Sequence, residues 1–157
     1  MRTMVLALLL VTATPAAAQH AEHAQEADRA AVMATVDRLF GALASKDRAA
    51  LLGAVVAEGR ATSTGVDAAG RPEIVSTDWT TFADRLARST ERLGERLIDP
   101  HVHVEGDIAM IWSRYEFERN GAFSHCGIDH FDLVRIDGRW RVLNLTWTRQ
   151  TTGCPGR

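Results

Sequence analysis

The sequence predicts an α+β domain in which three N-terminal helices pack on a strongly curved antiparallel sheet. Apolar residues recur every 3.6 positions through the first half of the chain, which indicates amphipathic helices. From Leu97 the period changes to two, which indicates strands. Turn signals at residues 105–107, 120–121 and 137–138 divide this second half into four strands, because Asn-Gly and Asp-Gly favour tight hairpins. Helices followed by a run of hairpins are typical of the α+β class.

The first 18 residues are expected to form a cleaved secretory signal. Arg2 precedes an apolar run over residues 4–11, and an A-x-A pattern of small residues ends at Ala18. The run is well short of the roughly 20 residues that span a bilayer, and no later stretch approaches that length. We therefore expect a periplasmic or secreted protein without a membrane span. The rest of the chain divides into a mobile lead-in, one domain and a tail, at residues 19–27, 28–150 and 151–157.

The helices follow from apolar stripes and capping residues. An apolar face over residues 27–44 predicts the first helix, and Asp47 is a suitable N-cap for a second, shorter one. Residues 60–70 are expected to form a short strand and turn. Thr77 or Asp78 then caps a third helix.

The charge pattern excludes a polyanion-binding protein. The chain carries 18 Lys and Arg against 20 Asp and Glu, and Lys46 is its single lysine. A nucleic-acid-binding surface needs clustered basic residues, whereas the arginines here alternate with acids. No nucleic-acid partner is expected.

The two cysteines, Cys126 and Cys154, are expected to form a disulfide. An exported chain reaches an oxidising compartment, where a pair of cysteines normally bonds. The bond would tie the C-terminal tail to a strand. Two free thiols or a zinc site that recruits histidines are the alternatives.

Two-residue turns predict the strand register. They place Trp112 opposite Asp129, and Asp129 opposite Thr146, unless a bulge shifts the pairing by one residue. The face expected to pack on the helices carries Met110, Trp112, Asp129, Phe131, Leu133, Trp140, Val142, Asn144 and Thr146.

The opposite face of the sheet is also expected to be apolar. It carries Tyr115, Phe117, Ile128, Leu143, Leu145 and Trp147. Three helices cover only one face, so we expect a homodimer that buries the outer one. Closure of the sheet on itself, or cover by the tail, is the alternative.

The turn at Asp137-Gly138, followed by Trp140 and an alternating strand, resembles the nuclear transport factor 2-like (NTF2-like) superfamily. Within it the chain is similar to the exported SnoaL-like and lumazine-binding-like proteins, over roughly residues 28–149. The resemblance implies a cone-shaped fold, in which the sheet wraps around the first helix and leaves a pocket open at one end. The expected lining residues of that pocket are Trp112, Phe131, Trp140, Asn144 and Thr146, around Asp129.

Asp129 is the first candidate for a functional group. A carboxylate on an apolar inward face is desolvated, so its pKa rises toward acid or base function. A structural brace bonded to Asn144 or Thr146 is the alternative. His125 shares the strand face and could act as a general base, although roughly 13 Å separates the two at about 3.3 Å per residue. Tyr115 is expected on the outer face; a bulge that turned it inward would let its hydroxyl donate to an oxyanion.

These features predict an exported pocket protein that binds a small apolar or aromatic molecule without a cofactor. Two alternatives stay open: a cofactor-free isomerase, dehydratase or cyclase that uses Asp129, and a homodimeric protein-interaction module. The catalytic pattern of ketosteroid isomerase-like relatives is not matched, since Thr62-Ser63-Thr64 stand on the strand where their carboxylate base lies. His101 and His103 are too few ligands to predict a metal site.

Overall fold

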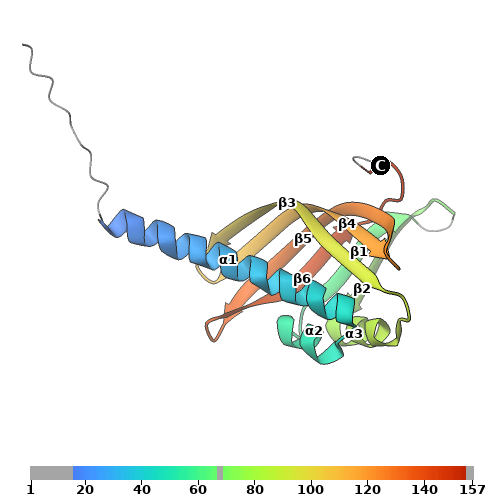
Figure 1. The fold of residues 1–157 in the computed structure, drawn as a ribbon, viewed down its shortest axis with the longest axis horizontal. Coiled ribbons are helices and arrows are strands. Elements are labelled where there is room, and N and C mark those ends of the chain that lie inside the picture. The colour runs from blue at the N-terminus through green and yellow to red at the C-terminus, as the bar shows by residue number, and fades with distance from the viewer. Residues whose placement is uncertain (1–15, 67–68, 155–157) are drawn as a thin grey trace, which may run out of the picture.

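Residues 16–66 and 69–154 are described by the structure, a computed structural model, and within these ranges three helices pack against a six-stranded sheet. The helices are α1 (Ala16–Ser45), α2 (Arg48–Ala54) and α3 (Trp79–Arg88). The strands are β1 (Arg60–Val66), β2 (Pro72–Asp78), β3 (Leu93–Glu105), β4 (Ile108–Arg119), β5 (Ala122–Ile136) and β6 (Arg139–Thr148). Figure 1 shows α1 lying across one face of the sheet, with α2 and α3 near its C-terminal end. The predicted α+β class is confirmed.

The sheet is mixed rather than wholly antiparallel. Its strand order is β2-β1-β6-β5-β4-β3, and among the described strands β1 pairs with β6 in parallel. The first strand of the sheet, β1, therefore lies beside the last strand, β6. Strand β2 was not predicted, since its side chains are mostly exposed and leave no alternating apolar signal.

The helix caps confirm the sequence analysis, but α1 is longer than expected. Asp47 accepts a hydrogen bond from the backbone N–H of Ala50 at 2.9 Å, and Asp78 accepts one from Thr81 at 2.8 Å. The first helix begins at Ala16 rather than near residue 27, because the alanine-rich segment between favours helix. Most of the expected signal, residues 1–15, lies outside the described residues.

Two β-bulges change the predicted register. Glu118 pairs with Phe123, as the turn at Asn120-Gly121 requires, but the register then shifts by one residue. Asp129 consequently lies opposite Ser113 rather than Trp112. A second shift, between the Leu133 and Asp132 pairs of β5 and β6, places Asp129 opposite Trp147 rather than Thr146. The predicted pairings of Asp129 were therefore wrong, because each extra residue reverses the side-chain alternation beyond it.

The bulges decide which side chains reach the inner face, by which we mean the face that packs on α1. Tyr115, Leu145 and Trp147, expected outside, lie inside. Trp112 is 49% exposed on the outer face. Asn144 and Thr146 share that outer face with it. The core between the sheet and α1 contains Val32, Val36, Leu39, Ile111, Phe131, Leu133 and Val142.

The predicted disulfide between Cys126 and Cys154 is confirmed, with a Cα–Cα distance of 6.0 Å. The backbones of Cys126 and Gln150 also exchange two hydrogen bonds of 3.0 Å. These contacts hold the segment after β6 against β5. In the described part of the chain, no helix is both long and apolar enough for a membrane crossing.

Candidate functional site

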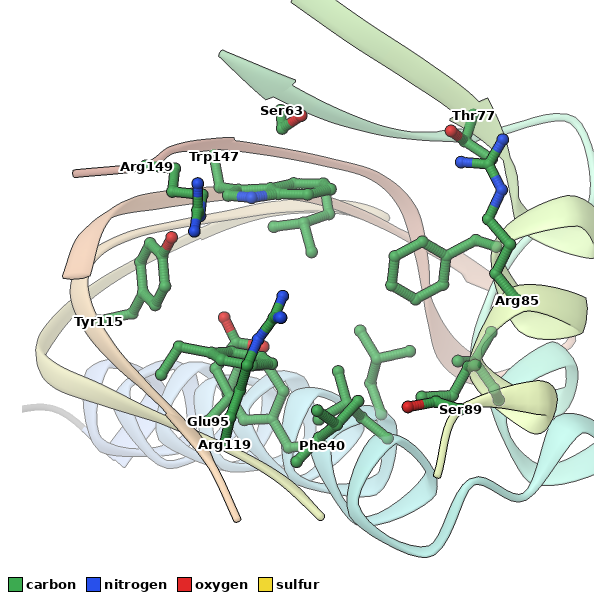
Figure 2. Close-up of a pocket in the computed structure, with 18 of the residues that line it drawn as sticks. Phe40, Ser63, Thr77, Arg85, Ser89, Glu95, Tyr115, Arg119, Trp147 and Arg149 are labelled. Atoms are coloured by element: carbon green, nitrogen blue, oxygen red, sulfur yellow. The ribbon is translucent and has the colours of Figure 1, made fainter. Parts of the chain in front are cut away.

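A cavity of about 390 Å³ lies between the inner face of the sheet, α1 and α3. Most of its wall is aromatic or aliphatic, and includes Leu39, Phe40, Phe82, Phe117, Leu145 and Trp147. Its polar groups include Glu95, Tyr115, Arg119 and Arg149, which Figure 2 labels, and also His125. Both arginines are exposed, so the cavity opens to solvent at their end. An apolar hollow with few polar groups is the usual form of a small-molecule site.

A pair of carboxyl groups lies beside this cavity. Asp129 is fully buried on β5, and Glu95 reaches it from β3 while also lining the cavity. Among the described residues, no hydrogen-bond donor reaches the two buried oxygens of Asp129, and the Glu95 carboxyl is the charged group that acts on them. Two carboxylates in contact cannot both be ionised without a large repulsion, so the pair shares a proton.

Burial is the main cause of the altered acidity of this pair. It raises the pKa of Glu95 from 4.5 to about 8. The pKa of Asp129 also lies well above its usual value, first because of burial and then because of the Glu95 charge. The pair therefore holds a proton at neutral pH, and one carboxyl group can donate a hydrogen bond there while the other accepts.

Tyr115 lies on the inner face beside the carboxyl pair. Its hydroxyl donates a 2.8 Å hydrogen bond to the backbone carbonyl of Thr148. Burial, followed by the charges of Asp129 and Glu95, raises its pKa. Gly127, which pairs with Tyr115, brings the backbones of β5 and β6 together, since a Cβ there would lie 2.1 Å from the Thr148 carbonyl oxygen. The hydroxyl stays protonated and is already used as a donor.

His125 also faces inward, but its ring packs with aromatic side chains rather than with Asp129. It stacks on Phe117 with ring centroids 4.7 Å apart and meets Tyr115 edge-on at 5.8 Å. Burial, then the charges of Arg149 and Arg119, lowers its pKa to about 4. His125 is therefore neutral at physiological pH.

The other expected pocket residues do not line the cavity. Phe131 and Trp140 point inward but belong to the core. The ring centroids of Phe131 and Phe40 lie 6.0 Å apart. The Trp140 indole nitrogen lies 3.5 Å from a carboxylate oxygen of Asp28. Trp112 packs on His130 on the outer face. Asn144 accepts from the Arg60 backbone and donates to Asp132, and Thr146 is exposed.

Sequence reasoning missed Glu95, Trp147 and the two arginines at the open end. Glu95 interrupts an alternating apolar row, Leu93-x-Glu95-x-Leu97, which was overlooked because the strand was expected to begin at Leu97. Trp147 was assigned to the outer face because the bulge in β6 has no evident sequence signal. In the described ranges, no three His, Cys, Asp or Glu side chains converge to hold a metal ion.

The three helices and six strands of the described residues form the NTF2-like fold, which solved NTF2-like proteins share. The chain belongs to the family described as "Putative lumazine-binding", which it matches over residues 27–148. No curated protein matches the sequence.

Solved structures share this fold at low sequence identity. An NTF2-like protein with a cystatin-like fold from Novosphingobium aromaticivorans has a TM-score of 0.66 at 17% identity, over 92% of this chain and 94% of that one. An NTF2-like protein from Cytophaga hutchinsonii has a TM-score of 0.65 at 13% identity, over 78% and 98%. A protein described as a "putative dehydratase" from Streptomyces avermitilis has a TM-score of 0.59 at 15% identity, over 80% and 97%.

Proposed function

We propose that this chain is an exported protein that binds a small apolar or aromatic molecule in the cavity beside Trp147. The observation that carries the proposal is the apolar cavity of about 390 Å³, which falls within the range of roughly 300–1,000 Å³ that is usual for small-molecule pockets. The family description, which refers to the binding of an aromatic heterocycle, supports the same class of ligand.

Binding of a neutral fluorescent probe, N-phenyl-1-naphthylamine, tests the proposal on the full chain in its oxidised form. Trp147 lines the cavity, whereas Trp112 is exposed on the outer face. We expect Trp147→Ala to weaken binding by about tenfold or more, since a lost aromatic contact is worth upwards of about 1.4 kcal/mol. The matched variant Trp112→Ala should bind as the wild type does. Absence of binding, or equal losses in both variants, would contradict a cavity site.

A second candidate function is cofactor-free acid–base catalysis, as in an isomerase, dehydratase or cyclase. The observation that favours it is the carboxyl pair, because Glu95 faces the cavity and Asp129 shares its proton. Of the pair only Glu95 lines the cavity, so its carboxyl group would exchange a proton with a substrate carbon, and Asp129 behind it would share that proton. The Streptomyces avermitilis protein described as a "putative dehydratase" is similar in fold.

Proton exchange into the enolisable ketone 2-tetralone, followed by NMR in D₂O, tests this candidate. The wild type should accelerate exchange, while Asp129→Asn should keep probe binding and lose the acceleration. Asp132→Asn is the control, because Asp132 lies on the same strand but on the outer face. Exchange no faster with the wild type than with Asp129→Asn would count against catalysis.

Export would place the protein in an oxidising compartment, and the bonded Cys126 and Cys154 agree with such a location. We propose cleavage after Ala18. Mass spectrometry of the protein recovered from a periplasmic or culture fraction should then give a chain that begins at Gln19. A mass that retains the first 18 residues would contradict cleavage.

We also propose that two copies associate through the outer face of the sheet. Leu145 and Trp147, first expected in this contact, face inward, so the apolar groups available for it include the exposed Trp112 and Ile108 and the half-buried Ile128. Light scattering should give a dimeric mass for the wild type and a monomeric mass for Trp112→Glu. A monomeric wild type would overturn this arrangement, and with it the dimeric interaction module.

A further inference from the structure

The inner rows of β4 and β6 change from aromatic to cationic at the same end of the sheet. Alternate residues of a strand share a face, so Arg119 follows Phe117 on the inner side of β4. In the same way Arg149 follows Trp147, one residue beyond the end of β6. Both arginines line the cavity, and Figure 2 shows their guanidinium groups directed toward it.

Strand β5 lies between these two strands and brings His125 to the same place. His125 pairs with Phe117, and the charges of both arginines act on its ring. Burial, and then these two charges, lower the pKa of His125 to about 4, so it adds no positive charge at neutral pH. It contributes a flat neutral surface between two cations.

The positive charge at this end is only partly balanced. The Arg119 Nη1 atom lies 3.4 Å from a carboxylate oxygen of Glu91, and the Arg119 side chain is 48% exposed. In the part of the chain that the structure describes, no acidic side chain forms an ion pair with Arg149. Glu95 does not balance it fully, because it shares a proton with Asp129. The open end of an apolar cavity therefore carries a cationic surplus.

We infer that Arg119 and Arg149 form an anion clamp at the mouth of the cavity, and that the ligand is an amphipathic aromatic anion. Its ring system would pack on Phe117 and Trp147, and its anionic group would lie between the two guanidinium groups. Arginine suits this role, since its planar donors bind carboxylate, sulfonate and phosphate oxygens in pairs. The inference rests on the proposed binding function and names the class of molecule bound.

Two probes of almost the same shape test the clamp on the oxidised full chain. 1-Anilinonaphthalene-8-sulfonate carries a sulfonate that N-phenyl-1-naphthylamine lacks. We expect the sulfonate to bind about tenfold or more tightly than the neutral probe. Raising NaCl from 50 to 500 mM should weaken the binding of the sulfonate only, because salt screens a partly exposed ion pair.

Substitutions locate the effect. Arg119→Gln and Arg149→Gln should each weaken sulfonate binding by about tenfold, the scale of one charged hydrogen bond, and change the neutral probe by less than about twofold. The control is Arg114→Gln, because Arg114 lies on the same strand and pairs with Asp99 on the outer side. If a glutamine variant does not fold, the lysine variant at the same position keeps the charge and should keep the salt dependence.

The outcomes separate this inference from the proposed function. Equal affinity for the two probes, unaffected by salt and by the arginine variants, would overturn the clamp and leave the cavity site standing. Failure of both probes to bind would overturn the cavity site, and the clamp with it. Comparison of 2-naphthoate with 2-naphthyl phosphate, in competition with the sulfonate, then distinguishes a carboxylate from a phosphate ligand.

Discussion

Asp129→Asn is expected to change how the stability of this protein depends on pH. In the wild type, the pKa of Glu95 is about 8 in the folded state against an ordinary value of 4.5. Between these pH values the folded protein holds a proton that the unfolded chain has released. A rise in pH therefore favours unfolding, and the stabilisation present in full below pH 4.5 is lost by about pH 8. The raised pKa of Asp129 acts in the same direction.

The size of the effect follows from proton linkage. One proton difference between the two states changes the free energy of unfolding by about 1.4 kcal/mol per pH unit. For a domain of this size, that corresponds to a fall in Tm of roughly 4–6 °C per pH unit. The Asp129→Asn variant removes the titration of Asp129, whose own raised pKa adds to the slope, and its amide can donate a hydrogen bond to an ionised Glu95. The slope of Tm between pH 5 and pH 8 should then become markedly smaller.

Thermal unfolding by circular dichroism at pH 5, 6, 7 and 8 measures both slopes. The matched control is Asp132→Asn, which changes a carboxylate of the same strand whose side chain is 45% exposed on the outer face. The control should keep the wild-type slope. Equal slopes in the wild type and Asp129→Asn would refute the shared proton, and the acid–base candidate would lose its basis.

Three further predictions concern packing and the tail. Removal of the disulfide by Cys126→Ser with Cys154→Ser should destabilise the oxidised protein by roughly 3–4 kcal/mol, given a sequence separation of 28 residues, and dithiothreitol should lower the Tm of the wild type alone. Gly127→Ala should lower the free energy of unfolding, measured with denaturant, by several kcal/mol, because its Cβ would lie 2.1 Å from the Thr148 carbonyl oxygen. The matched variant Gly53→Ala in α2, whose Cβ would meet nothing within 4 Å, should raise the free energy of unfolding by about 0.5–1 kcal/mol. Tyr115→Phe should lower stability by about 1–2 kcal/mol through loss of its hydrogen bond to Thr148 and leave the pH slope in place; a flat slope would show that the hydroxyl belongs to the proton-sharing group.

Much of the fold could be predicted because its signals are local. The caps at Asp47 and Asp78, the three hairpin turns and the disulfide each depend on a few neighbouring residues or on a single pair. Strand β2 escaped prediction because an exposed edge strand carries no burial pattern. The inward position of Asp129 was also anticipated, and its burial is confirmed.

The two bulges are the main features that sequence reasoning could not place. Strands β4 and β6 each carry large apolar residues on both faces. The sequence pattern is therefore compatible with either set of alternate side chains facing α1. Trp112 and Trp147 illustrate the result, since each occupies the face expected for the other. A bulge costs little locally, and its position is decided by how the sheet packs on α1.

By itself, then, the amino-acid sequence determined the order of helices and strands, the turns, the bonded cysteines and a buried acid on β5, because short-range periodicity and residue type encode all of these. Only the tertiary structure decided that Glu95 of β3 lies beside Asp129, and that Arg119 and Arg149 lie together at the open end of the cavity. The physical reason is that these side-chain positions depend on the register between strands. One inserted residue in a strand exchanges the faces on which the following side chains lie.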